Sequence, residues 1–371
     1  MVTCRICKKS YEDLPIFLRV CKECIRNRWE KAKPFIEEVF SVRKKLGLPI
    51  FPPRDEEGIT CKDCGNECRI GEGRKGYCGL VVNENGKLKR LLGTKDEGLF
   101  TYYYDPHPTN CVAAPWCGSS GVGYPEFSLF PHREVGYYNL AVFSGSCNFF
   151  CLYCQNWESW HQMISEMAPK LRIRELINAM NDKTTCACFF GGSPSTQPEF
   201  LLNFMKLSET RKEELGLKVF RVCIEDSGNF SWHWLKEIAE HSLKSGGGIK
   251  FDLKTPEGSK LNIALSGVSN EKAYENFRRL ASFHRKRPEV PFLRASTLLV
   301  PHYIDVNEVR EIAGFLAEID EEIPYSLLAF YPHYKFRDVG FTSRKFALEC
   351  LKVCKEIGLK NVKIGNVHLL V

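Results

Sequence analysis

Short apolar runs alternate with longer amphipathic stretches from about residue 136 to residue 371. The runs predict strands at residues 137–143, 186–190, 218–224, 248–254, 292–300, 324–330 and 361–367. Between them, apolar residues at helical spacing predict helices at 198–207, 231–243, 270–286, 305–319 and 343–358. Strands that alternate with helices indicate an α/β fold with a parallel sheet, either an open barrel of six (βα) units or a doubly wound sheet. In both folds, functional residues belong at the carboxyl ends of the strands.

The first 135 residues lack this alternation. We expect a zinc-ribbon-like module and a basic helix in residues 1–57, a second cysteine-rich module in 58–95, an irregular linker in 96–135, and the barrel in 136–371. The basic helix falls within 26–47, where seven basic and three acidic residues give a charge of +4. We interpret it as a solvated face, with contact to nucleic acid or an acidic partner as the alternative.

Composition places the chain among ordinary globular proteins, with 44% hydrophobic and 26% charged residues and a net charge of +7. No apolar run approaches the roughly 18 residues that a membrane span needs, and the first residues lack the apolar region of a signal peptide. We therefore expect a cytoplasmic protein without membrane contact.

Cysteine is the unusual component, because 18 are present and ten of them lie in residues 1–117. In a chain expected to be cytoplasmic, C-x-x-C groups favour metal ligands over disulfides. The segment SGSCNFFCLYCQNW (144–157) holds three cysteines, Cys147, Cys151 and Cys154. Structural zinc takes four protein ligands, and so does a ferredoxin-type cubane. Three cysteines can hold a [4Fe–4S] cluster with one open iron; a zinc site that borrows a fourth ligand is the alternative.

This motif, placed after the first barrel strand, resembles that of the radical S-adenosylmethionine (SAM) superfamily. Within it, the chain is similar to the pyruvate formate-lyase activating enzymes, and most of all to the branch found in AmmeMemoRadiSam-type systems. The resemblance covers residues 58–371 and rests on CNFFCLYCQNW, FFGGSPSTQPEF, FDLK, STLLVPHYID and VKIGNV.

The resemblance implies an oxidoreductase-type enzyme in which the open iron binds SAM. Reductive cleavage of SAM would then give a 5′-deoxyadenosyl radical that abstracts hydrogen from a substrate. It also implies a reducing electron donor of the ferredoxin or flavodoxin type and, by analogy with the activating enzymes, a glycine in a partner protein as substrate. No catalytic residue is predicted beyond the cluster ligands.

The SAM contacts are expected at the strand ends. After the second barrel strand, Gly191 and Gly192 allow close approach of the backbone to the SAM amino group, with a tight turn as the alternative. Ser193 follows where the family often has a glutamate, so this contact would come from backbone carbonyls or the serine. Glu225 or Asp226 would hold the amino group or a nearby cation, or only cap the next helix.

Further contacts are expected on later strands. Asp252 and Lys254 share a face, so the lysine would meet the SAM carboxylate or form a buried pair with the aspartate. Arg294 is a weaker candidate for the carboxylate. Tyr331 and His333 are candidates for the adenine or ribose.

The front cysteines form separate groups. Cys4, Cys7, Cys21 and Cys24 have the spacing of a zinc site. The second group is favoured as zinc over an auxiliary cluster and comprises Cys61, Cys64, Cys68 and Cys78. Cys111 and Cys117 could bind a metal, contact substrate or simply be buried. Core packing is expected for Cys186, Cys188, Cys223, Cys350 and Cys354.

Two rival functions remain open. One is radical SAM modification of RNA or a small metabolite, to which the zinc module and basic helix lend some support. The other is a non-enzymatic zinc-binding interaction protein, which would hold zinc and no iron or sulfide.

Overall fold

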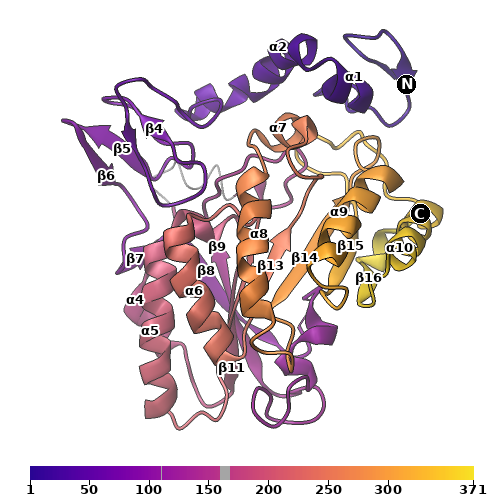
Figure 1. The fold of residues 1–371 in the computed structure, drawn as a ribbon. Coiled ribbons are helices and arrows are strands. Elements are labelled where there is room, and N and C mark those ends of the chain that lie inside the picture. The colour runs from indigo at the N-terminus through magenta and orange to yellow at the C-terminus, as the bar shows by residue number, and fades with distance from the viewer. Residues whose placement is uncertain (110, 159–167) are drawn as a thin grey trace.

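The computed structural model describes residues 1–109, 111–158 and 168–371, and is built around one open, curved sheet of eight strands (Figure 1). The expected segments 96–135 and 136–371 contain residues 110 and 159–167, which lie outside the described residues. The strands run in the order β8, β9, β11, β12, β13, β14, β15 and β16. Their bounds are Phe100–Pro106, Tyr138–Ser144, Thr184–Gly191, Arg221–Asp226, Ile249–Asp252, Leu293–Leu299, Tyr325–Ala329 and Val362–Gly365.

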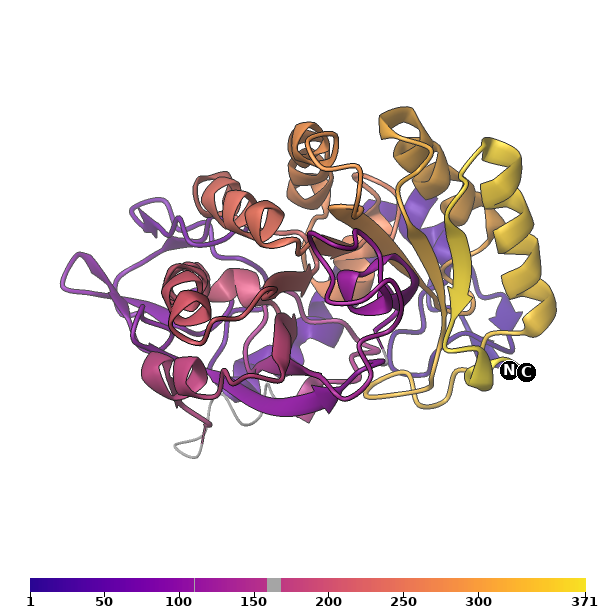
Figure 2. The same ribbon diagram turned by 90° about the horizontal axis from the view of Figure 1, so that it is seen from below.

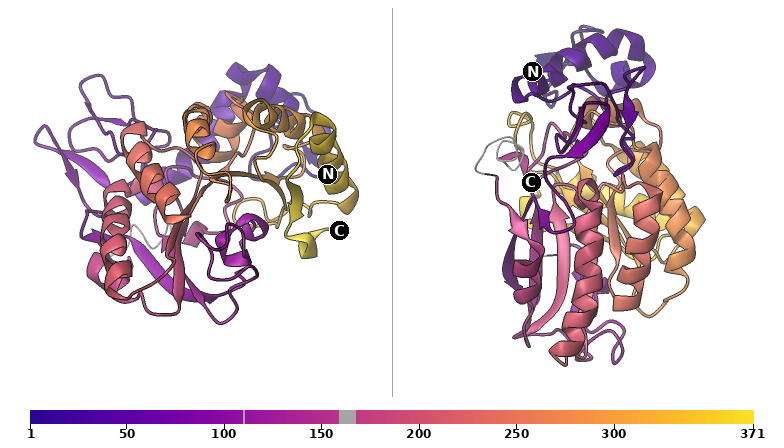
Figure 3. Two further views of the ribbon diagram at one scale, coloured as in Figure 1. Left: turned by 60° about the horizontal axis from the view of Figure 1, so that its bottom comes forward. Right: turned by 90° about the vertical axis from the view of Figure 1, so that its left-hand side faces the viewer.

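All neighbouring strands from β9 to β16 pair in parallel, which confirms the α/β fold. Each of the seven predicted strand segments overlaps one of these strands. The helices lie outside the curve of the sheet, and its concave side faces the loops (Figures 2 and 3). They are α4 (Ile173–Asn178), α5 (Pro198–Glu214), α6 (Trp232–Ser245), α7 (Lys260–Ser266), α8 (Glu271–His284), α9 (Val306–Ile319) and α10 (Arg344–Ile357).

One strand was not expected. Residues 100–106, placed in an irregular linker by sequence, form β8, which pairs antiparallel with β9 at one edge of the sheet. Tyr102, Tyr103 and Tyr104 are all exposed, so the strand shows none of the alternation that marks a half-buried strand. Two 3₁₀ turns follow it, at Ala114–Trp116 (η2) and Gly118–Ser120 (η3).

The front of the chain lies across one end of the barrel (Figure 1). It contains small hairpins and short helices: β1 (Val2–Thr3), β2 (Ser10–Tyr11), α1 (Lys22–Asn27), α2 (Trp29–Phe40), η1 (Ser41–Leu46), β3 (Ile59–Thr60), β4 (Arg69–Ile70), β5 (Val81–Glu84) and β6 (Lys87–Arg90). β7 (Glu97–Gly98) pairs with β10 (Leu171–Arg172). The expected basic helix is therefore three pieces, α1, α2 and η1.

An ion cluster joins the first module to the barrel. Glu308 in α9 has a fully buried side chain, and its carboxylate forms ion pairs with the ammonium of Lys22 at 3.2 Å and the guanidinium of Arg26 at 2.8 Å. Lys22 also contacts Asp305, the N-cap of α9. Because a buried carboxylate is stable only with such partners, this contact fixes the module on the barrel. No helix among the described residues has the length and apolar character of a membrane span.

Candidate functional site

The three cysteines of the opening motif lie on the loop after β9 and line one cavity. Cys147, Cys151 and Cys154 are each half-buried, and the cavity beside them has a volume of about 960 Å³. Its wall continues over the carboxyl ends of β11, β13, β14 and β15, as expected for a parallel sheet. Burial raises the pKa of Cys147 to about 12. A metal is therefore needed to hold this sulfur as a thiolate at neutral pH.

Two glycines bring the loop after β11 against the cysteine loop. A Cβ on Gly192 would lie 2.0 Å from the carbonyl oxygen of Ser146, so only glycine fits there. The amide of Gly192 donates to Ser144 O at 3.0 Å, and that of Ser193 donates to Ser146 O at 2.7 Å. Gly191 has φ +99°, which also favours glycine. The two loops are thus held backbone to backbone.

Ser193 and Asn156 tighten the same contact. The hydroxyl of Ser193 lies 3.1 Å from Cys147 Sγ. The amide of Asn156 donates to Gly191 O at 3.1 Å. Both Gly191 and Ser193 line the cavity, as expected, and their contact with SAM remains a prediction.

Asp226 does not line this cavity. Its carboxylate is buried and accepts from Ser195 N at 3.1 Å, Ser195 Oγ at 2.9 Å and Gly228 N at 2.8 Å. Burial raises its pKa to about 6, against the effect of these donors. The residue joins the loops after β11 and β12, which is a positioning role.

Charged side chains at the end of β13 and just after it line the same cavity. Lys254 lies 3.8 Å from Asp252, and both line the cavity as predicted. Burial opposes the charge of Lys254, but Cys151 and Asp252 outweigh it and raise its pKa. Asp252 also accepts from Ser296 at 2.5 Å. The wall therefore offers a fixed cation beside the three sulfurs.

Besides Asp226, four more of the predicted SAM contacts do not line the first cavity. Glu225 and Arg294 face a second, deeper cavity on the concave side of the sheet. Tyr331 and His333 border a shallow surface depression, where His333 Nε2 lies 3.1 Å from the indole nitrogen of Trp157. Alternation along a strand predicts which face of the sheet a side chain lies on. It does not predict which of two cavities on that face the side chain lines.

Several other residues line the first cavity although the sequence motifs predict no role for them. They are Gln155, Asn156, Ser227, Ser296, Leu298, Leu328 and Asn366. Most of them lie near the carboxyl end of a strand. Asn366 follows β16 with φ +53°, and the GNV sequence at that point was the available signal.

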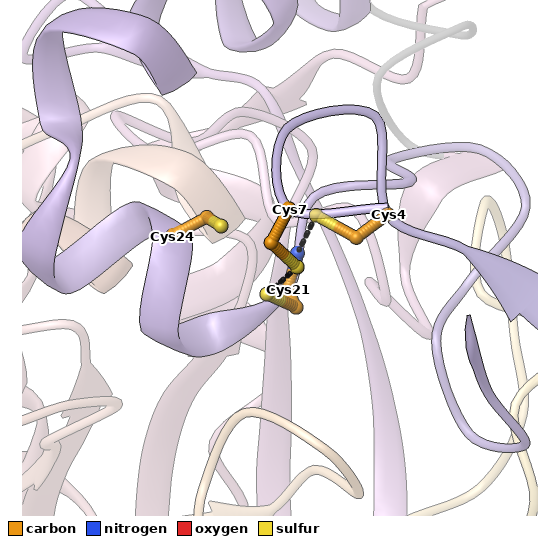
Figure 4. Close-up of side chains that lie close together, drawn as sticks. All are labelled: Cys4, Cys7, Cys21 and Cys24. Atoms are coloured by element: carbon orange, nitrogen blue, oxygen red, sulfur yellow. Dashed lines mark hydrogen bonds between the residues drawn. The ribbon is translucent and has the colours of Figure 1, made fainter. Parts of the chain in front are cut away.

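The four cysteines of the first module form a compact group. The sulfurs of Cys4, Cys7, Cys21 and Cys24 all lie within 4.8 Å of one another (Figure 4). A zinc ion with bonds of about 2.3 Å places tetrahedral sulfurs roughly 3.8 Å apart, so the group can close around one ion.

The other cysteine groups are wider. In the part of the chain that the structure describes, no three sulfurs of Cys61, Cys64, Cys68 and Cys78 lie mutually within 4.8 Å, and the same holds for the three cysteines of the first cavity. A multi-iron cluster separates its cysteine ligands more than a single ion does, because each thiolate binds its own iron. The iron–sulfur cluster at Cys147, Cys151 and Cys154 stays a prediction.

The second module is attached directly to the cysteine loop. Asn66 donates to Asn148 O at 2.8 Å and accepts from Asn229 at 2.8 Å, while Asn148 donates to Asn229 O at 2.9 Å. Next to this amide network, the guanidinium of Arg43 lies 3.8 Å from the ring centre of Tyr77 and 4.8 Å from that of Phe150. The second module thus packs against the cysteine loop.

Comparison with known proteins agrees with this geometry. Residues 141–316 match the radical SAM superfamily. The uncharacterized protein MJ0808 of Methanocaldococcus jannaschii is 25% identical over 84% of this chain and 83% of its own length. MJ1632 of the same organism, named as a candidate glycyl-radical enzyme activating enzyme, is 24% identical over 60% of this chain and 77% of its own length.

Two solved structures are similar at low scores. Streptococcus suis SuiB bound to S-adenosylmethionine has a TM-score of 0.41 at 14% identity; the match covers 60% of this chain and about half (49%) of that one. A domain of pyruvate-formate lyase-activating enzyme from Bacteroides vulgatus has a TM-score of 0.38 at 20% identity, covering 48% of this chain and 98% of that one. Residues 141–316, which include all three cysteines of the first cavity, match the radical SAM superfamily, so the chain carries a radical SAM domain, and one of its relatives, MJ1632, is named as a candidate glycyl-radical enzyme activating enzyme.

Proposed function

We propose that this chain is an enzyme that cleaves SAM reductively at a [4Fe–4S] cluster bound by Cys147, Cys151 and Cys154. The observation that carries the proposal is the convergence of these three cysteines, the Gly191–Ser193 loop and Lys254 on one cavity. When bound, the cluster and SAM supply a 5′-deoxyadenosyl radical for hydrogen abstraction.

The protein's own residues bind and orient. Gly192 lets the loop after β11 approach the cysteine loop, where its carbonyls can accept from the SAM amino group. Lys254 offers a fixed positive charge to the SAM carboxylate, with Asp252 holding its ammonium in place. The half-buried cavity limits the water that reaches the reacting atoms.

The front modules have supporting roles in this proposal. The compact group of Cys4, Cys7, Cys21 and Cys24 suits a structural zinc ion. The second group, Cys61, Cys64, Cys68 and Cys78, is proposed to bind zinc, with an auxiliary iron–sulfur cluster as the alternative. Its module contacts the cysteine loop through Asn66, which under that alternative suits a path for electrons from an external donor.

The direct test is the formation of 5′-deoxyadenosine from SAM by anaerobically reconstituted protein reduced with dithionite. Cys151→Ala should abolish the product and remove about four irons per chain. Cys350→Ala, which changes a fully buried cysteine of α10, is the matched control and should retain both. Equal product from Cys151→Ala and the parent would exclude this cavity as the cluster site.

We further propose a glycine of a partner protein as the substrate, which the name of MJ1632 supports. A glycyl radical detected by electron paramagnetic resonance on the partner after incubation would agree. Modification of RNA is the rival outcome. It requires RNA binding that weakens with salt, by roughly 0.7 to 0.9 units of logarithmic slope for each phosphate contacted.

A further inference from the structure

A second cavity lies on the concave side of the sheet, nearer the amino ends of the strands. On β13 and β14, Lys250 and Arg294 line it and lie two residues before Asp252 and Ser296 of the first cavity. These separations are even, so both cavities are on the same face of the sheet.

Five cysteines line the cavity. Cys186 donates to Asn139 Oδ1 at 3.3 Å, and the other four come from three segments of the chain. Cys188 and Cys223 are direct register partners on β11 and β12. Cys111 and Cys117 come from the segment that follows β8 and covers the cavity. Cys111 donates to Glu225 at 3.2 Å. Core packing, expected for Cys188 and Cys223, does not account for the convergence.

The second observation is Arg294. Its side chain is buried and lines the cavity, its terminal nitrogen donates to Trp116 O at 3.0 Å, and its Nε has no hydrogen-bond partner in the described part of the chain.

A buried cation requires an anion. Glu225 is the carboxylate that lines this cavity, and it pairs with Lys250 at 2.5 Å. Four neutral thiols would leave Arg294 without a counter-charge. Thiolates bound to metal would provide one, because metal coordination removes the thiol proton.

The spacing of the sulfurs indicates the kind of metal. Among the described residues, no three of these sulfurs lie mutually within 4.8 Å, in contrast to the group of Cys4. A single tetrahedral ion needs sulfurs roughly 3.8 Å apart, whereas a cluster of two or more irons accepts wider spacing. All four cysteines are free.

We propose that Cys111, Cys117, Cys188 and Cys223 bind an iron–sulfur centre inside the curve of the sheet, separate from the three-cysteine site, with Arg294 as its counter-charge. The centre lies on the same face of the sheet as the first cavity, nearer the amino ends of the strands. The proposal does not depend on SAM cleavage, because metal and sulfide content can test it directly.

The test uses full-length protein, anaerobically reconstituted with iron and sulfide and then desalted. Iron, acid-labile sulfide and zinc are measured per chain. Cys188→Ala/Cys223→Ala should lose at least about two irons and two sulfides, with zinc unchanged. Cys350→Ala is the matched control and should lose none. Cys117→Ala, on the covering segment rather than the sheet, should also lose iron, and it serves if the double variant does not fold.

Several results would overturn the proposal. Iron and sulfide equal to the control in folded Cys117→Ala would do so. So would a loss of zinc in place of iron, or a Cys117–Cys223 disulfide found by mass spectrometry in anaerobic parent protein. Cys151→Ala separates the two proposals, because it should remove about four irons and leave the iron that Cys117→Ala removes. If the parent protein forms no 5′-deoxyadenosine but Cys117→Ala still loses iron, the proposed SAM cleavage is wrong and the second iron–sulfur centre is not.

Discussion

Gly192→Ala is the sharpest single test of how the cavity is built. The added methyl would lie 2.0 Å from Ser146 O and 2.9 Å from Ser144 O, both backbone atoms. Real contacts of this kind stay beyond 3.0 Å, so the loop after β11 must move by at least about 1 Å. Overpacking costs about 1–3 kcal/mol, and the two amide bonds at risk contribute about 0.5–1.5 kcal/mol each.

We therefore expect the free energy of unfolding to fall by about 2–6 kcal/mol, an amount that a domain of average stability can partly absorb. In the folded fraction, a displacement of about 1 Å at the site should reduce the rate of SAM cleavage by about 100-fold. Denaturant unfolding and 5′-deoxyadenosine formation measure the two effects.

Gly314→Ala is the matched control, since Gly314 is in the interior of α9 and a Cβ there meets nothing within 4 Å. It should stabilise the protein by about 0.5–1 kcal/mol and leave cleavage unchanged. The reasoning would be refuted if Gly192→Ala matched this control in both assays.

Three further predictions concern the barrel and its front module. Glu308→Gln should cost about 3–5 kcal/mol by leaving Lys22 without its buried partner, and limited proteolysis should then cut the first module faster; an unchanged pattern would argue against the ion cluster as its anchor. Burial lowers the pKa of His284, whose Nδ1 accepts from Leu293 N at 3.1 Å. His284 therefore binds a proton more tightly in the unfolded chain than in the folded one, and the free energy of unfolding should fall as pH drops from about 7 to 5. His284→Gln should weaken this dependence in denaturant titrations, and an identical slope would contradict it. Cys4→Ala should lose about one zinc per chain but keep 5′-deoxyadenosine formation; loss of the product would show that the module is not separate from catalysis.

The sequence predicted the parts of the fold that depend on repeated local pattern. Every expected strand after residue 136 was found, because each apolar run is long and each intervening helix is amphipathic. Four of the predicted SAM contacts, Gly191, Gly192, Asp252 and Lys254, line the first cavity, where the strand-end rule expects functional residues.

What sequence missed depends on contacts between distant residues. β8 is an edge strand with exposed tyrosines, so no periodicity marked it. Glu225 and Arg294 were expected beside SAM but line the deeper cavity, since one residue pair along a strand changes depth by nearly 7 Å. The convergence of Cys111 and Cys117 on Cys223 joins segments more than 100 residues apart, and no local pattern records it.

The amide network of Asn66, Asn148 and Asn229 has a consequence for biosynthesis. Cys61 to Cys78 leave the ribosome well before Asn229, which lies 163 residues after Asn66. At about 5–20 residues per second, the second module waits roughly 10–30 s for the surface on which it docks. During that interval its four thiols are outside any folded barrel, so the cell must either deliver the metal early or shield the nascent segment from oxidation.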